Sequence, residues 1–161
     1  MFIKRVVLIA LIIGAGGASQ DHNGTSLYRT LCSECHMAYQ PQLLPARSWE
    51  KIMGNLEDHF GVDATVEERE RRLLTEYLKE RSGDRRGAGE LGEFAQSVPP
   101  NETPLRISET PYFKKEHREI PKRLVKQREV KSFANCTACH PRAQRGEYEP
   151  ISIPNYGPWE D

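Results

Sequence analysis

Two Cys-x-x-Cys-His pentads constrain this chain more than any other feature of its sequence. They span residues 32–36 (CSECH) and 136–140 (CTACH) and contain all four cysteines of the 161-residue chain. Two thiols three residues apart on one helical turn can each add to a vinyl group of the same porphyrin, and the adjacent histidine can then reach the iron. The pentads therefore predict two covalently attached c-type haems.

Structural zinc binding and dithiol redox chemistry are the alternative uses of such pairs. A zinc site needs four thiol or imidazole ligands in one place, whereas these two pairs are about a hundred residues apart and a histidine follows each. A thioredoxin-like dithiol normally sits in a βαβ pattern and would explain neither the second copy nor the histidine. Haem attachment is therefore the preferred interpretation.

The amino terminus has the layout of a secretory signal. Lys4 and Arg5 precede an apolar run over residues 6–13, and small residues follow through Ala18. We expect residues 1–18 to be a signal peptide, because the apolar run is too short for a permanent membrane span. An uncleaved anchor is the alternative. Since c-type haems are attached outside the bacterial cytoplasm, the periplasm is the expected compartment, and the cysteines would form thioethers there rather than disulfides.

Composition and periodicity predict a mainly α fold: small c-type cytochrome-like helices around two covalently bound haems, with long irregular loops. Without the predicted signal peptide, 143 of the 161 residues remain, which suits one compact unit or two small lobes. The hydrophobic content of 37% is low for a large core, so two buried porphyrins would supply the missing apolar surface. The sequence shows no strand pattern of useful length.

Apolar spacing predicts several short helices. One leads from residue 26 into the first pentad, a second has Ser48 as its N-cap, and a third begins with a capping box of Thr65 and Glu68. Pro121 is expected to separate two short helices before the second pentad. The third helix is expected to turn inward Leu73, Leu74, Tyr77 and Leu78.

We expect two haem-bearing halves. The first half covers residues 19–81 and the second half covers residues 104–161. Residues 82–103 between them are rich in glycine, proline and charge. This composition indicates a linker or surface loop.

The sixth ligand of each iron decides between electron transfer and small-molecule chemistry. Apart from the pentads and the start of the chain, two histidines remain, and each is 23 residues from a pentad histidine: His59 after His36, and His117 before His140. His59 lies beside the apolar stripe of its helix and His117 has aromatic neighbours. These surroundings favour a role as iron ligands for both histidines over that of solvent-exposed side chains. Met53, on the same stripe as His59, is the competing ligand and would raise the potential of that haem.

The sequence around the pentads resembles the bacterial dihaem cytochrome c family. The similar blocks are CSECHMAY (32–39), LLPARSW (43–49), DHFG (58–61), NCTACHP (135–141) and ISIP (151–154). The resemblance covers most of residues 25–155. It implies a soluble periplasmic electron carrier with two bis-His haems, paired in some members with an oxygen-binding monohaem cytochrome and a membrane cytochrome b.

The resemblance and the pentads together give the expected haem-binding residues. The thioether cysteines are Cys32, Cys35, Cys136 and Cys139, the proximal ligands are His36 and His140, and the residues that match the distal positions are His59 and His117. Proximity in the sequence assigns His59 to the first haem and His117 to the second.

Charge is distributed unevenly along the chain. Eleven basic residues stand against four acidic ones between Thr103 and Arg145, a net of +7, and five against nine between Trp49 and Glu80, a net of −4. The region around the second haem would therefore attract an acidic partner and the first half a basic one. Ordinary solvated faces are the alternative. Nucleic acid is not an expected partner, since the chain carries 23 basic and 23 acidic residues.

We therefore predict an electron-transfer protein, not an enzyme, that passes single electrons between periplasmic redox partners and has no membrane span after signal cleavage. Two alternatives stay open. One is a haem enzyme, a peroxidase or a small-molecule reductase, with one open iron position. The other is the small dihaem subunit of a periplasmic reductase.

Overall fold

The structure is a computed structural model that describes residues 18–158. It is mainly helical, as predicted, with α1 Ala18–Cys32, α2 Ala46–Met53, α3 Glu68–Glu80, α4 Gly92–Gln96, α5 Pro111–Glu116 and α6 Lys122–Val125. Five single-turn 3-10 helices complete the helical set: η1 Pro41–Leu43, η2 Leu56–Asp58, η3 Ile107–Glu109, η4 Cys136–Ala138 and η5 Ala143–Arg145. Strands β1 Ser152–Ile153 and β2 Gly157–Pro158 form a two-residue antiparallel pair.

The predicted signal peptide lies outside the described residues except for Ala18, which is the first residue of α1. In the described part of the chain, no helix has both the length and the apolar character that crossing a bilayer requires.

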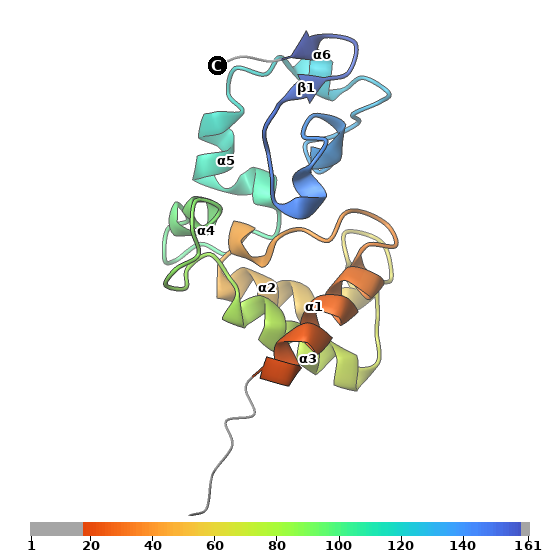
Figure 1. Cartoon of the computed structure of the whole chain (residues 1–161), viewed down its shortest axis with the longest axis vertical. Helices are drawn as coiled ribbons and strands as arrows, with labels where there is room; N and C mark the ends of the chain where they lie inside the picture. Colours follow the sequence, from red (N-terminus) through yellow and green to blue (C-terminus); the bar gives the residue numbers. More distant parts are fainter. Residues whose placement is uncertain (1–17, 159–161) are drawn as a thin grey trace, which may run out of the picture.

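The first half is a three-helix unit, drawn at the bottom of Figure 1, in which α3 packs against both α1 and α2. Its core consists of Tyr28, Leu44, Trp49, Met53, Leu74 and Leu78, all at most 5% exposed. Trp49 is fixed by a hydrogen bond from Nε1 to the carbonyl of Pro41, 2.8 Å long. Burial of this apolar cluster stabilises the three-helix unit. Met53 lies within the cluster, among apolar side chains.

Two predicted helix starts were wrong. Helix α2 begins at Ala46 with Pro45 at the N-cap, and Ser48 is fully buried in its first turn. The extended backbone of Pro45 suits an N-cap, and its carbonyl accepts the first bond, from Ser48 N.

Helix α3 begins at Glu68, with a capping box of Glu67 and Glu70 instead of Thr65 and Glu68. The Thr65 amide is held in the preceding turn by Asp63, at 2.9 Å.

The inward face of α3 is also narrower than predicted. Leu74 and Leu78 are 1% exposed, whereas Leu73 is 36% exposed. Tyr77 is partly buried against the core and stacks at an angle on Tyr28, with ring centroids 5.6 Å apart. Only one stripe of a helix can face a neighbouring core, and Leu73 lies outside it.

The segment between the halves is packed against both of them. Within residues 82–103, α4 contacts η1 and α5, and Gly92 and Ala95 are buried. Arg47 of α2 donates to the carbonyls of Pro99 and Glu102, at 2.9 and 2.7 Å. The predicted linker therefore includes a short helix, while the boundaries of the two halves stay a prediction.

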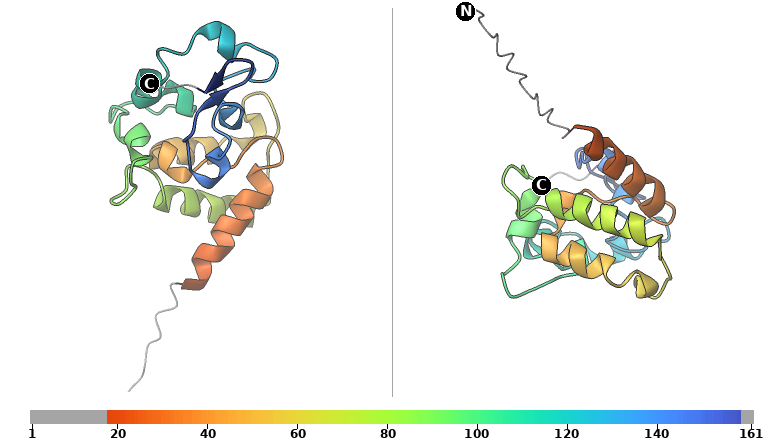
Figure 2. Two further views of the ribbon diagram at one scale, coloured as in Figure 1. Left: turned by 45° about the horizontal axis from the view of Figure 1, so that its top comes forward. Right: turned by 90° about the horizontal axis from the view of Figure 1, so that it is seen from below.

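The second half, at the top of Figure 1 and Figure 2, left, consists of short helices and loops around a small apolar set. Thr110 caps α5 by accepting from the amide of Phe113 at 3.3 Å, and Pro111 occupies the first helical position. Pro121 separates α5 from α6, as predicted. With so little regular structure, these elements line a cavity instead of filling a core.

The contrast between Leu74 and Leu73 gives a test of the first core. We expect Leu74→Ala to lower the free energy of unfolding by about 3 kcal/mol, because it leaves a cavity in a fully packed cluster. We expect the neighbouring Leu73→Ala to cost less than about 1 kcal/mol. Guanidinium denaturation of the haem-loaded protein, followed by circular dichroism, measures both. Equal losses would contradict the packing described here.

Candidate haem sites

The first pentad lies at the carboxyl end of α1. Cys32 is the last residue of the helix and is half-buried, while Cys35 is exposed in the following turn. Burial raises the pKa of the Cys32 thiol to about 11. The His36 ring stacks on Tyr39, with centroids 4.9 Å apart. Its Nδ1 lies 2.7 Å from the carbonyl oxygen of Met37, and since a carbonyl can only accept, Nδ1 carries the proton and Nε2 is left for a metal.

His59 faces His36 across the first site. Their ring centroids are 6.1 Å apart and their planes differ by 27°. His59 is held in a tight turn, because it exchanges backbone hydrogen bonds with Val62 at 2.8 and 3.3 Å, and Phe60 has the left-handed φ of +58° that the turn requires. Burial, with a smaller contribution from nearby His36, lowers the pKa of His59. The neutral imidazole that this favours is the form that binds metals.

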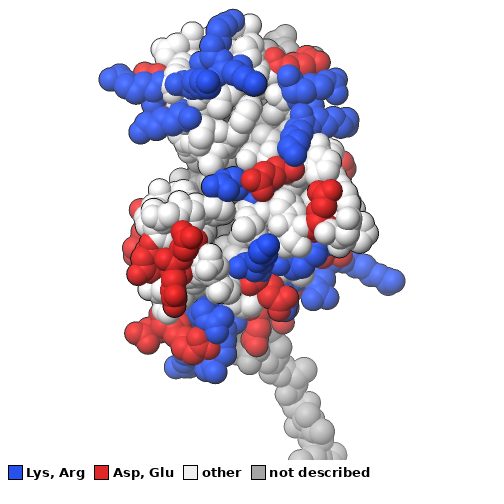
Figure 3. All heavy atoms as spheres, turned by 180° about the vertical axis from the view of Figure 1, so that it is seen from behind, with Lys and Arg blue, Asp and Glu red and all other residues white. Residues whose placement is uncertain are grey.

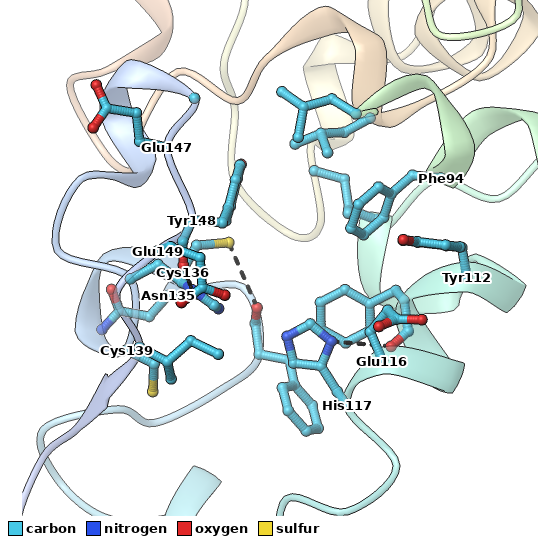
Figure 4. Close-up of a pocket in the computed structure, with 18 of the residues that line it drawn as sticks. Phe94, Tyr112, Glu116, His117, Asn135, Cys136, Cys139, Glu147, Tyr148 and Glu149 are labelled. Atoms are coloured by element: carbon cyan, nitrogen blue, oxygen red, sulfur yellow. Dashed lines mark hydrogen bonds between the residues drawn. The ribbon is translucent and has the colours of Figure 1, made fainter. Parts of the chain in front are cut away.

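The second pentad opens into a cavity of about 830 Å³. Figure 4 shows His117 entering this space from α5, with Cys136 and Cys139 on the facing wall. The apolar lining includes Phe113, Leu124, Val130, Phe133 and Ile153. Burial raises the pKa of the Cys136 thiol to about 11, which reflects the same apolar surroundings. A large apolar cavity beside two thiols fits a covalently attached porphyrin.

His117 faces His140 across this cavity. Their ring centroids are again 6.1 Å apart, but their planes differ by 73°. His117 is the C-cap of α5, and its ring lies flat on Phe113 with centroids 3.8 Å apart and planes 6° apart. Its Nδ1 bonds the carbonyl of Phe113 at 3.0 Å, and His140 Nδ1 bonds the carbonyl of Tyr148 at 2.6 Å. Both histidines therefore present Nε2 for a metal.

The spacing of each histidine pair suits one metal ion between them. Two imidazoles that bind one ion from opposite sides, each with a metal–nitrogen bond of about 2 Å, have ring centroids about 6 Å apart. Both pairs match this distance. Within residues 18–158, no three or more His, Cys, Asp or Glu side chains gather as a metal-binding group. The zinc alternative, which needs four such ligands together, has no support in this arrangement.

Sequence reasoning missed the residues that join the two sites. Tyr39 donates from its hydroxyl to the carbonyl of Ala134 at 2.6 Å, and Gln40 donates from Nε2 to the carbonyl of Ala143 at 2.8 Å. The Tyr148 hydroxyl donates to Oε1 of Gln40 at 2.6 Å. These three bonds cross between segments about a hundred residues apart, and no periodicity or motif in the sequence marks them.

Two Cys-x-x-Cys-His pentads, each facing a further histidine at the spacing of a six-coordinate iron, define a c-type cytochrome with two haem sites. Residues 28–148 match the family described as dihaem cytochrome c. The chain belongs to this dihaem cytochrome c family, and its cofactors are two c-type haems. It is accordingly a haem-containing electron-transfer protein.

Solved structures show the same fold. The diheme cytochrome c from Rhodobacter sphaeroides is 42% identical, with a TM-score of 0.69 over 76% of this chain and 95% of that one. The diheme cytochrome type c from Shewanella baltica OS155 is 33% identical, with a TM-score of 0.69 over 85% of this chain and 98% of that one. A search of curated proteins finds no significant match.

The pentad cysteines give a direct test of haem attachment. We expect the double variant Cys136→Ser, Cys139→Ser to carry one covalent haem instead of two, because serine hydroxyls do not add to the porphyrin vinyl groups. Mass spectrometry of the denatured protein counts the haems. Ser33→Ala with Thr137→Ala, which changes only the inner pentad positions, is the control and should retain both. Two covalent haems in the serine variant would refute the assignment.

Proposed function

We propose that this cytochrome carries single electrons between two redox partners, with each haem held by two cysteine thioethers and two histidines. The thioethers come from Cys32, Cys35, Cys136 and Cys139. The iron ligands are His36 with His59 at the first haem and His140 with His117 at the second. The observation that carries the proposal is the pairing of each pentad histidine with a second imidazole at 6.1 Å.

Ligation by two protein groups favours electron transfer over chemistry on a small molecule. The haem, when bound, supplies the reversible one-electron couple. The chain would supply two imidazoles to each haem. It orients those of His36, His117 and His140 through their Nδ1 protons, and it surrounds the second site with apolar side chains. A peroxidase or a reductase would need an open iron position.

The proposed compartment is the periplasm. The support is the signal-like sequence of residues 1–18 and the pentads themselves, since bacterial c-type haems are attached outside the cytoplasm. Electron carriers there meet partners by diffusion, so the charged surface of the second half becomes relevant to function.

Ligand orientation predicts two different paramagnetic resonance signals from the oxidised protein. Two parallel imidazole planes act on the same iron d orbital, so they separate the energies of the two d orbitals that share the unpaired electron. Two perpendicular planes act on these two d orbitals equally and leave their energies close together. The planes differ by 27° at the first site and by 73° at the second. We therefore expect a rhombic low-spin signal from the first haem and a highly anisotropic low-spin signal from the second. Neither should change on addition of cyanide, and carbon monoxide should not bind after reduction.

Single-ligand variants assign the two signals. His59→Ala should remove the rhombic signal and His117→Ala the highly anisotropic one, each with a new high-spin component that binds carbon monoxide when reduced. Met53→Leu is the control, because Met53 is 3% exposed within the first core and should leave both signals unchanged. A high-spin or cyanide-sensitive haem in the unmodified protein would favour the enzyme alternative instead.

A basic patch on α6 is the proposed docking surface for an acidic partner. Figure 3 shows lysines and arginines gathered over the second half. Lys122, Arg123 and Lys126 are exposed, and they pair with no carboxylate among the side chains that the structure describes. The inner face of the same helix supplies Leu124 and Val125 to the cavity wall. A partner on this patch would thus stand one helix away from the second site.

The proposed physiological partners are an oxygen-binding monohaem cytochrome and a membrane cytochrome b.

Charge reversal tests this docking surface. We expect Lys122→Glu with Lys126→Glu to slow reduction by the hydroquinone of an acidic flavodoxin about tenfold or more at low ionic strength, because steering by unpaired surface charge is lost. Stopped-flow absorbance measures the rate, and the difference should shrink as salt is added. Arg69→Glu with Arg72→Glu makes the same change of charge on exposed positions of α3 and should have little effect. Equal slowing by both pairs would mean that only net charge matters.

A further inference from the structure

Gln40 reaches from the first half to the loop that carries the second proximal histidine. It lies four residues after His36, just before η1. Its Nε2 donates to the carbonyl of Ala143 at 2.8 Å, and its Oε1 accepts from the Tyr148 hydroxyl at 2.6 Å. Because the Ala143 carbonyl can only accept, the amide has one orientation, and Oε1 is necessarily the atom that faces Tyr148.

Tyr148 passes this contact on to His140. The backbone carbonyl of Tyr148 accepts the Nδ1 proton of His140 at 2.6 Å, and the two rings lie edge to face with centroids 5.3 Å apart. Ala143, the other residue held by Gln40, is fully buried in the same loop. Gln40 therefore fixes two points of the loop whose carbonyl orients the imidazole of the second pentad.

We propose that Gln40 is a positioning residue for His140, so that the first half of the chain sets the ring orientation of a ligand in the second haem site. The geometry provides one continuous chain of contacts: the Gln40 amide, the Tyr148 hydroxyl, the Tyr148 carbonyl and the His140 Nδ1 proton. Groups that accept the second ring proton of a metal-bound histidine fix its orientation and raise its basicity. The inference rests on the proposed ligation of iron by His140 and His117.

The ring orientation matters because the two sites differ in it. At the second site the planes of His117 and His140 are 73° apart, while His117 is held independently by Phe113, through ring stacking and through its carbonyl. Loosening the loop at residues 143–148 would therefore free one ring of the pair and leave the other fixed. The angle between the planes, and with it the electronic state of the iron, would change at this site alone.

Gln40→Met tests the proposal, because methionine has a similar length and makes neither hydrogen bond. We expect the highly anisotropic signal to shift and broaden, and one of the two midpoint potentials to move, while the rhombic signal and the other potential stay unchanged. Tyr148→Phe removes the hydroxyl that donates to Gln40 but keeps the ring and the backbone carbonyl. It should therefore change the anisotropic signal and the same midpoint potential as Gln40→Met does. Haem content of each variant is measured by pyridine haemochrome, so that loss of haem is not mistaken for reorientation.

Two control variants separate positioning from general loosening. Tyr39→Phe also breaks a hydrogen bond between the halves, the one from the Tyr39 hydroxyl to the Ala134 carbonyl. This bond is not part of the contact chain to His140. Gln96→Met removes a hydrogen bond from the side-chain amide to the carbonyl of Gly83, which is not part of the contact chain to His140. Both should lower stability without moving the anisotropic signal.

The outcomes distinguish this inference from the proposed function. An unmodified protein without two low-spin bis-His signals would refute the proposed ligation itself. If the unmodified protein shows both signals and Gln40→Met leaves them and both potentials unaltered, the positioning role is refuted while the ligation stands. If Tyr39→Phe changes the anisotropic signal as much as Gln40→Met does, contact between the halves in general, and not Gln40, controls the site, and the proposal is overturned.

Discussion

The arrangement of each pentad histidine opposite a second histidine is the constraint on which the rest of this structure depends. In both halves the two imidazoles come from segments 23 residues apart in the chain and lie 6.1 Å from each other. The surrounding elements are short, and the buried apolar side chains outside the three-helix core of the first half are spread over several of these elements. At a hydrophobic content of 37%, the chain would gain apolar interior from its two haems when they are bound.

The two sites reach the same spacing by different local means, and this makes them chemically unequal. His59 sits in a tight turn after η2, whereas His117 ends a helix and lies flat on Phe113. The resulting ring angles are 27° and 73°. The second site also has the large apolar cavity and the exposed basic residues of α6 beside it. Two unequal sites on one chain suit a carrier that accepts an electron at one end and gives it up at the other.

The sequence predicts the haem sites better than the elements between them. Covalent chemistry fixes the pentad spacing, and apart from His22 near the start of the chain only His59 and His117 lie outside the pentads, so local patterns were enough to propose them as partners. Helix starts depended on competition between neighbours: Pro45 displaced Ser48 from the N-cap, and Asp63 held Thr65 in a turn. Gln40 and Tyr148 could not be found because their importance arises from contact across the whole fold, which no local pattern records.

The segment that follows the first pentad contacts the histidine of that pentad and the loop beside the histidine of the second pentad. The Met37 carbonyl holds the Nδ1 proton of His36, and the Tyr39 ring stacks on the same imidazole. One residue later, Gln40 reaches the loop that orients His140. The Tyr39 carbonyl is itself anchored by the buried Tyr28 of α1, at 2.8 Å. Residues 37–40 therefore connect the three-helix unit, through Tyr28, to the histidine of the first pentad and to the loop beside the histidine of the second.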